Sequence, residues 1–121
     1  METLTGMERT ATCGELRITD VDKEVQLAGW VSRRRDHGGL IFVDMRDRSG
    51  LVQVVFDGST EGLDFSKAET LRNEFVIGVR GKVRARSEDT INPKMATGEI
   101  EILATELRIL NKAKTPPFYI Q

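Results

Sequence analysis

The sequence predicts a mainly β fold, a five-stranded Greek-key barrel with a short helix between the third and fourth strands. Apolar residues recur at every second position over residues 24–57 and 74–86, which is the spacing of strands with one buried face. The segment between them has apolar residues at helical spacing instead. The 121 residues, 39% hydrophobic and 31% charged, are typical of one folded domain.

Three strands joined by short turns form the first half of the predicted barrel. Alternation places them over residues 25–35, 40–46 and 51–56. The first turn contains His37-Gly38-Gly39, and Gly50 ends the second. Because glycine suits a tight hairpin turn, we expect a three-stranded meander.

The helix falls within residues 64–73, where Asp64 can cap its N-terminus. The fourth strand is predicted over residues 74–86, with Gly78 and Gly81 permitting a bend or a bulge. The loop of residues 87–98 leads to a fifth strand over residues 99–110. The apolar face of the helix is expected to hold Phe65, Ala68 and Leu71. In the fourth strand we expect Phe75, Ile77, Val79, Val83 and Ala85 on one face and Arg80, Lys82, Arg84 and Arg86 on the other.

This order of elements matches the OB-fold, a small barrel that commonly binds oligonucleotides or oligosaccharides. We assign residues 15–112 to the barrel and residues 1–14 to an N-terminal extension and lead-in. Thr115-Pro116-Pro117-Phe118 cannot continue a strand, because proline lacks the N–H donor. Residues 113–121 are therefore predicted to begin a linker to an absent domain.

Composition and motifs exclude several functions. No apolar run approaches the roughly 18–20 residues that span a bilayer, and residues 1–15 lack a signal-peptide pattern, so we expect a cytoplasmic protein without a membrane partner. One cysteine, Cys13, and one histidine, His37, leave no internal disulfide and no Cys/His zinc site. Motifs of common catalytic sites are lacking. We therefore expect no metal, cofactor or catalytic residue in this fragment, and we expect Asp44 and Asp47 to be solvated carboxylates.

Basic residues cluster along the chain although the net charge is only −1. Such a balance gives no overall attraction to nucleic acid. Three arginines are consecutive at residues 33–35, and basic residues alternate over residues 80–86 without an intervening acid. The chain can therefore present a local basic strip.

Two outward side chains of the meander are suited to nucleic acid. Phe42 points outward if its β-branched neighbours point into the barrel, since successive strand side chains alternate. It is then either covered by a loop or a platform on which an unpaired base stacks. Gln53 also points outward, and its amide can pair with the edge of a uracil. Arg33 and Arg35 project together near Phe42 and supply charge for phosphate. The inward residues are then Ile41, Val43, Met45, Val52, Val54 and Phe56.

Motifs along the chain resemble the N-terminal region of bacterial-type aspartyl-tRNA synthetase, a class II enzyme. The longest runs from Gly29-Trp30-Val31 to Arg46-Asp47-Arg48. Others lie at residues 50–56, 83–86, 91–93 and 96–101. The resemblance covers residues 9–118, and residues 1–6 precede the usual family start, which makes Met7 an alternative initiator.

The resemblance implies an anticodon-binding OB domain. In that family a phenylalanine matching Phe42 stacks under the middle anticodon base, and a glutamine matching Gln53 reads that base, a uracil. Residues that surround the outer bases match Arg33, Arg35, Arg86 and Glu101, with Asn92 nearby in the loop before the fifth strand.

The resemblance also implies what this fragment lacks. The parent enzyme attaches aspartate to tRNA in a catalytic domain that uses ATP and Mg²⁺ and forms a homodimer. His37 occupies a position that is often leucine in enzymes charging only aspartate tRNA, and histidine followed by glycine resembles enzymes that also charge asparagine tRNA. His37 as a surface residue without a partner remains the alternative.

Two other functions stay open on the residues alone. A general single-stranded nucleic-acid-binding module would use the same barrel without needing Gln53. A regulatory or assembly domain would leave the outer face unused, which the near-neutral charge permits.

Overall fold

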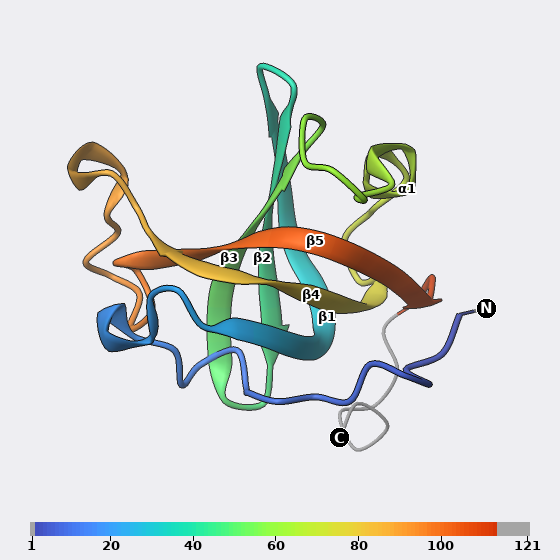
Figure 1. The fold of residues 1–121 in the computed structure, drawn as a ribbon, viewed down its shortest axis with the longest axis horizontal. Coiled ribbons are helices and arrows are strands. Elements are labelled where there is room, and N and C mark those ends of the chain that lie inside the picture. Colours follow the sequence, from blue (N-terminus) through green and yellow to red (C-terminus); the bar gives the residue numbers. More distant parts are fainter. Residues whose placement is uncertain (1, 114–121) are drawn as a thin grey trace.

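The computed structural model describes residues 2–113, so residues 114–121 of the predicted linker lie outside it. Its elements are η1 (Ile18–Asp20), β1 (Glu24–His37), β2 (Leu40–Asp47), β3 (Gly50–Asp57), α1 (Phe65–Glu69), β4 (Val76–Ala85), η2 (Glu88–Thr90) and β5 (Ile100–Asn111). The five strands in the described residues close into a barrel in the order β1-β2-β3-β5-β4 (Figure 1). Neighbouring strands are antiparallel except β3 and β5, which are parallel. The predicted mainly β five-stranded barrel is confirmed.

Alternation along β2 and β3 fills the barrel as predicted. The six inward residues are each 2% exposed or less, so the strands supply a dry core. Phe42 and Gln53 consequently take the outer face. The six inward residues are Ile41, Val43, Met45, Val52, Val54 and Phe56.

The hairpin of β1 and β2 projects beyond the barrel (Figure 1). It turns at Gly38 and Gly39, whose φ angles are +57° and +84°. Two consecutive residues with positive φ make a hairpin turn whose twist suits the flanking strands, and glycine adopts them without strain. The two glycines therefore permit the tight turn that joins β1 to β2.

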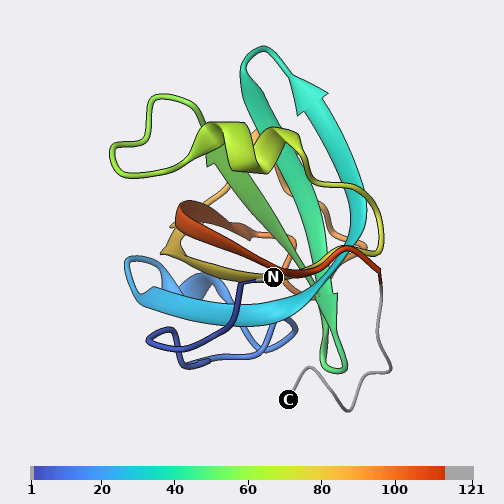
Figure 2. The same cartoon turned by 90° about the vertical axis from the view of Figure 1, so that its right-hand side faces the viewer.

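Helix α1 is shorter than the predicted stretch of residues 64–73 and ends at Glu69. Asp64 caps it as expected, its side chain accepting from the backbone N–H of Lys67 at 3.2 Å. Beyond this end the carbonyl oxygens of Glu69 and Leu71 accept from the guanidinium of Arg34, each at 2.7 Å, which supplies partners outside the helix. Figure 2 shows α1 lying across one end of the barrel.

The end of β4 departs from the predicted alternation. Ile77, Val79 and Val83 are buried as expected, but Ala85 is exposed and Arg86 is only 9% exposed. β4 ends at Ala85, so burial at this end of the strand no longer follows from alternation. The guanidinium of Arg86 folds back to donate to the carbonyl oxygen of Ile100 at 2.9 Å. The predicted irregularity is confirmed at Gly81 by a register shift between Arg80 and Gly81, whereas the strand pairing around Gly78 shows no shift at that residue.

The segment before β1 is fastened to the turn between β2 and β3. Asp47, expected to be solvated, is only 6% exposed, and that expectation is wrong. Its carboxylate accepts hydrogen bonds from the backbone N–H groups of Cys13 and Ser49, each at 2.8 Å. A Cβ at Gly14 would collide with the backbone of Ser49, so glycine permits this close approach. Cys13 is fully buried against the barrel core as a result.

Candidate nucleic-acid interface

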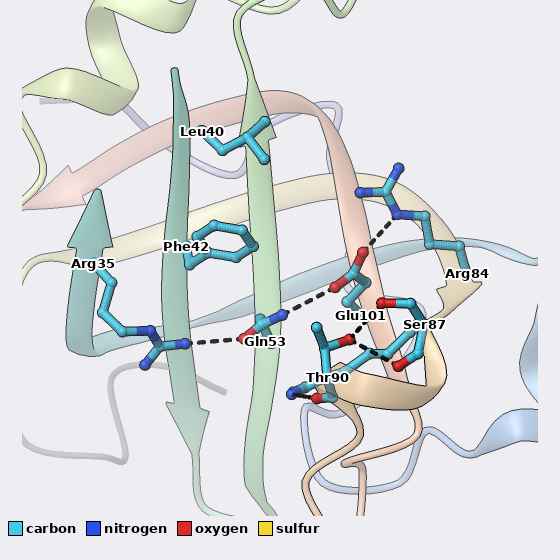
Figure 3. A pocket seen from close by; sticks show the side chains of 9 residues that line it. Arg35, Leu40, Phe42, Gln53, Arg84, Ser87, Thr90 and Glu101 are labelled. Carbon is cyan, nitrogen blue, oxygen red and sulfur yellow. Dashed lines mark hydrogen bonds and ion pairs between the residues drawn. The ribbon is translucent and has the colours of Figure 1, made fainter. Parts of the chain in front are cut away.

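An open pocket of about 310 Å³ lies on the outer face of the barrel (Figure 3). Five of the eight sequence-predicted site residues line it, namely Arg35, Phe42, Gln53, Arg86 and Glu101. The structure adds four residues that sequence reasoning did not assign to the site, namely Leu40, Arg84, Ser87 and Thr90. Alternation with Phe42 and with Arg86 was a signal for Leu40 and Arg84, whereas Ser87 and Thr90 lie in a loop and gave none.

One residue from each strand enters a connected network across this face, which we call the five-strand network. Arg35 of β1 donates to Asp44 of β2 at 3.1 and 3.3 Å and to Oε1 of Gln53 in β3 at 2.9 Å. Gln53 Nε2 in turn donates to Glu101 of β5 at 2.9 Å. Arg84 of β4 completes the network by donating to the other carboxylate oxygen of Glu101 at 2.7 Å (Figure 3).

Gln53 points outward as predicted but is only 6% exposed. Its amide is covered by the network partners, which use one acceptor and one donor position. A side-chain amide carries two acceptor lone pairs and two N–H donors, so one of each remains for a ligand. Those remaining groups can pair with a base edge that offers a donor beside an acceptor.

Phe42 provides an apolar surface next to these polar groups. Its half-buried ring lies between Leu40 and Gln53 on the same face (Figure 3). Arg35 is the register partner of Phe42 on β1, so a cation flanks the ring. An aromatic face with a cation beside it is the arrangement on which an unpaired base stacks.

Arg86 is a structural as well as a pocket residue. Its Nη1 donates to the carbonyl oxygen of Thr90 at 3.2 Å, which fastens the loop after β4 beside the pocket. Burial lowers the pKa of Arg86 from its usual value, while Glu101 and Asp44 oppose that shift by favouring the charged form. The arginine remains a cation, since even a lowered guanidinium pKa lies far above neutral pH.

The remaining three predicted site residues lie outside the pocket. Arg33 is exposed opposite Asp44, and its side chain makes no hydrogen bond or ion pair within residues 2–113. Asn92 shapes its own loop, its Oδ1 accepting from the backbone N–H of Lys94 at 3.0 Å. His37 is exposed at the end of β1, opposite Leu40, which does line the pocket.

Asp44 was expected to be a solvated carboxylate, and this expectation is wrong. Its side chain is 18% exposed and forms a bidentate ion pair with Arg35. Sequence reasoning missed this pair because it joins residues on different strands, and single-sequence patterns carry no register.

Neither a metal site nor a membrane-spanning helix is found in the described part of the chain. No group of histidine, cysteine and acidic residues is arranged to hold a metal ion among residues 2–113. No helix of that same range is long and apolar enough to cross a membrane.

The closed five-stranded barrel with a pocket on its outer face is the architecture of an OB-fold domain. The tRNA anticodon family model, described as an OB-fold nucleic acid binding domain, matches residues 25–110, and the chain belongs to this family. The sequence is 63% identical over 120 residues, 99% of this chain, to the aspartate–tRNA(Asp/Asn) ligase of Moorella thermoacetica. It is 58% identical over 116 residues, 94% of the chain, to the aspartate–tRNA ligase of Listeria welshimeri. These matches confirm the resemblance seen in the motifs.

The chain spans about a fifth of the length of the curated relatives it matches, 20% and 19% of these two. A solved asparaginyl-tRNA synthetase from Pyrococcus horikoshii superposes with a TM-score of 0.73 at 28% identity. That alignment covers 92% of this chain and 24% of the synthetase. The barrel therefore corresponds to one part of a longer protein in each case.

Proposed function

We propose that this chain is the anticodon-binding domain of an aspartate–tRNA ligase. The observation that carries the proposal is the pocket on the outer barrel face, where Phe42 and Gln53 lie within a set of charged side chains. It supplies a stacking surface, a donor–acceptor pair and cations, which are the groups that bind unpaired bases and their phosphates. The identity to aspartate–tRNA ligases supports the same assignment.

In this proposal each residue has a separate task. Phe42 stacks under the middle base, and Gln53 reads that base as uracil through its remaining lone pair and N–H group. Arg35, Arg86 and Glu101 surround the outer bases, because they line the same pocket. Arg33 and Asn92, which lie outside the pocket, contact the loop where it leaves the site.

The full-length protein would attach aspartate to tRNA, the reaction named for these relatives, in a catalytic domain separate from this barrel. ATP and Mg²⁺ belong to that domain, and no residue of this chain is assigned to them. Residues 15–112 form the anticodon-binding unit, residues 1–14 lead into it, and residues 113–121 begin the connection. A cytoplasmic location and a dimer formed through the catalytic domain complete the proposal.

Specificity for one or two tRNAs is assigned to His37. The name of the Moorella relative includes both aspartate and asparagine tRNA, whereas the name of the Listeria relative does not specify asparagine tRNA. Relatives with either name are therefore close to this chain in sequence. His37 is exposed at the hairpin end beside Leu40, where it can meet the third anticodon base. An imidazole can donate or accept a hydrogen bond there, and a leucine cannot.

A titration with three RNAs tests the proposed function. The chain is titrated with the anticodon stem-loop of aspartate tRNA, with the same stem-loop carrying a changed middle base, and with an unrelated single strand of equal length. The proposal predicts tight binding of the first RNA only. Equal binding of all three would instead indicate a general single-strand module, and binding of none would indicate an assembly domain.

A further inference from the structure

The amide of Gln53 is held between two groups of opposite character. On one side the guanidinium of Arg35 donates to Oε1 at 2.9 Å, and on the other the carboxylate of Glu101 accepts from Nε2 at 2.9 Å. A guanidinium can only donate, and an ionised carboxylate can only accept. If the amide turned by half a rotation, its N–H groups would face the guanidinium and its oxygen would face the carboxylate. Gln53 therefore has one allowed polarity.

A fixed polarity matters for telling two pyrimidines apart. Uracil presents an N3–H donor beside an oxygen acceptor, whereas cytosine presents an N3 acceptor beside an amino donor. A freely rotating amide matches either base, because turning it over exchanges its donor and acceptor. An amide that cannot turn matches uracil and sets like groups against each other for cytosine.

The outer members of the five-strand network are placed to keep the inner ones fixed. Asp44 engages two nitrogens of Arg35, and Arg84 engages the Glu101 oxygen that Gln53 does not use. Both carboxylates are well covered, at 18% exposure for Asp44 and 12% for Glu101, so the contacts are partly shielded from water. Asp44 is also an acid on a face that would meet phosphates, and its charge alone opposes RNA binding.

We propose that Asp44 and Arg84 are positioning residues that fix the amide polarity of Gln53, so that the pocket accepts uracil and rejects cytosine at the middle base. The inference rests on the proposed function, because it assumes that Gln53 reads that base. Neither residue needs to touch the RNA for this effect. Asp44 acts through Arg35, and Arg84 acts through Glu101.

The test compares binding of two stem-loops that differ only in uracil or cytosine at the middle position. The variants are Asp44→Asn and Arg84→Gln, each of which removes one charge from an end of the network. Asp36→Asn is the matched control, since Asp36 forms a similar two-pronged pair with Arg34 at 2.7 and 2.8 Å on the side facing away from the pocket. The measured quantity is the ratio of the two dissociation constants.

Asp44→Asn is expected to lower the preference for uracil by about tenfold, the effect of roughly one charge-assisted hydrogen bond. The loss should come mostly from tighter binding of the cytosine stem-loop, since the Gln53 amide can then turn to match cytosine. A merely structural defect would weaken both RNAs by the same factor and leave the ratio unchanged. Arg84→Gln should also lower the preference, with weaker binding of both RNAs, and Asp36→Asn should keep the parent ratio.

A second readout needs no RNA. The side-chain NH₂ signals of Gln53 should be sharp and slowly exchanging in the parent protein, and broadened in Asp44→Asn. If the parent prefers uracil and both network variants keep that preference, the positioning role is wrong while the proposed function stands. If the parent itself binds both stem-loops equally, the reading role of Gln53 fails and this inference with it.

Discussion

Nε2 of Gln53 in β3 donates a hydrogen bond to Oε1 of Glu101 in β5 across 2.9 Å. These strands are the parallel pair of the described barrel, and their register comprises only Val54 opposite Ile102 and Val55 opposite Leu103. The side-chain bond therefore adds a link where backbone pairing is short. A residue proposed to read a base is also part of the wall of its own pocket.

The stacking role of Phe42 predicts a loss of affinity that does not depend on the middle base. Phe42→Ala should weaken stem-loop binding by about 1–3 kcal/mol, since it removes the ring on which the base stacks but none of the charges. Phe42→Tyr should bind like the parent, and Phe42→Leu should behave like the alanine variant. Calorimetric titration measures all three, and an unchanged alanine variant would contradict the stacking role.

The exposed position of Arg33 predicts a change in salt dependence. Binding should weaken as salt rises, and Arg33→Ala should flatten the slope of log K against log salt by about 0.7 if it contacts one phosphate of a single strand. Arg34→Ala is the control, because Arg34 faces α1 and donates to backbone carbonyl oxygens there. If Arg34→Ala flattens the salt slope and Arg33→Ala leaves it unchanged, the phosphate contact belongs to Arg34, and the assignment to Arg33 is wrong.

Asp47 predicts acid sensitivity of the fold. Burial tends to raise its pKa, but hydrogen bonds from Ser49 and from the backbone of Cys13 outweigh burial, and the pKa lies below its usual value. A carboxyl group whose pKa is lowered in the folded state contributes stability above its unfolded pKa, near 4, and that stability is lost as pH falls through the folded pKa. Asp47→Asn should therefore lower the free energy of unfolding at pH 7 by about 1–3 kcal/mol and make unfolding less dependent on acid.

Asp57→Asn is the matched control for this prediction. Asp57 accepts from the backbone and hydroxyl of Ser59, just as Asp47 accepts from those of Ser49, but among the described residues its carboxylate accepts no hydrogen bond from the segment before β1. Denaturant unfolding at pH 7 and at pH 3 should show a small effect for Asp57→Asn. Equal effects of the two variants would mean that the link to Cys13 does not stabilise the fold.

His37 predicts a change in tRNA choice. Anticodon stem-loops of aspartate and asparagine tRNA differ only in the third anticodon base, and the parent chain should bind both. His37→Leu should keep the aspartate stem-loop and weaken the asparagine one, because leucine cannot hydrogen-bond to the base. Competition binding with labelled stem-loops measures the ratio, and a parent chain that strongly prefers the aspartate stem-loop would contradict dual specificity.

Most of the barrel could be predicted from the alternation of apolar and polar side chains along the strands. This alternation placed Phe42 and Gln53 on the outer face without any knowledge of partners, since a strand exchanges faces at every residue. It failed at Ala85, which is exposed where β4 ends. Arg86 lines the pocket with Arg84 as alternation predicts, but its burial depends on acceptors in β5 and the loop.

The network of charged residues could not be predicted in the same way. Asp44 and Asp47 look alike in sequence, three residues apart in a chain rich in acids. The environment of Asp44 is set by Arg35, and that of Asp47 is set by Cys13. Each aspartate meets its partner only when the barrel closes. Local patterns predict which face a residue takes, whereas the partner it meets depends on strand register and on the path of the preceding segment.

The pairing of Gln53 with the middle anticodon base is the central claim, and a thermodynamic cycle tests it most directly. Dissociation constants are measured for the parent and for Gln53→Ala, each with the aspartate stem-loop and with one carrying a changed middle base, after thermal unfolding has shown that the variant is folded. The account predicts a coupling of about 1–3 kcal/mol between residue and base, so that Gln53→Ala loses the parent's preference. An equal preference in parent and variant would contradict the account.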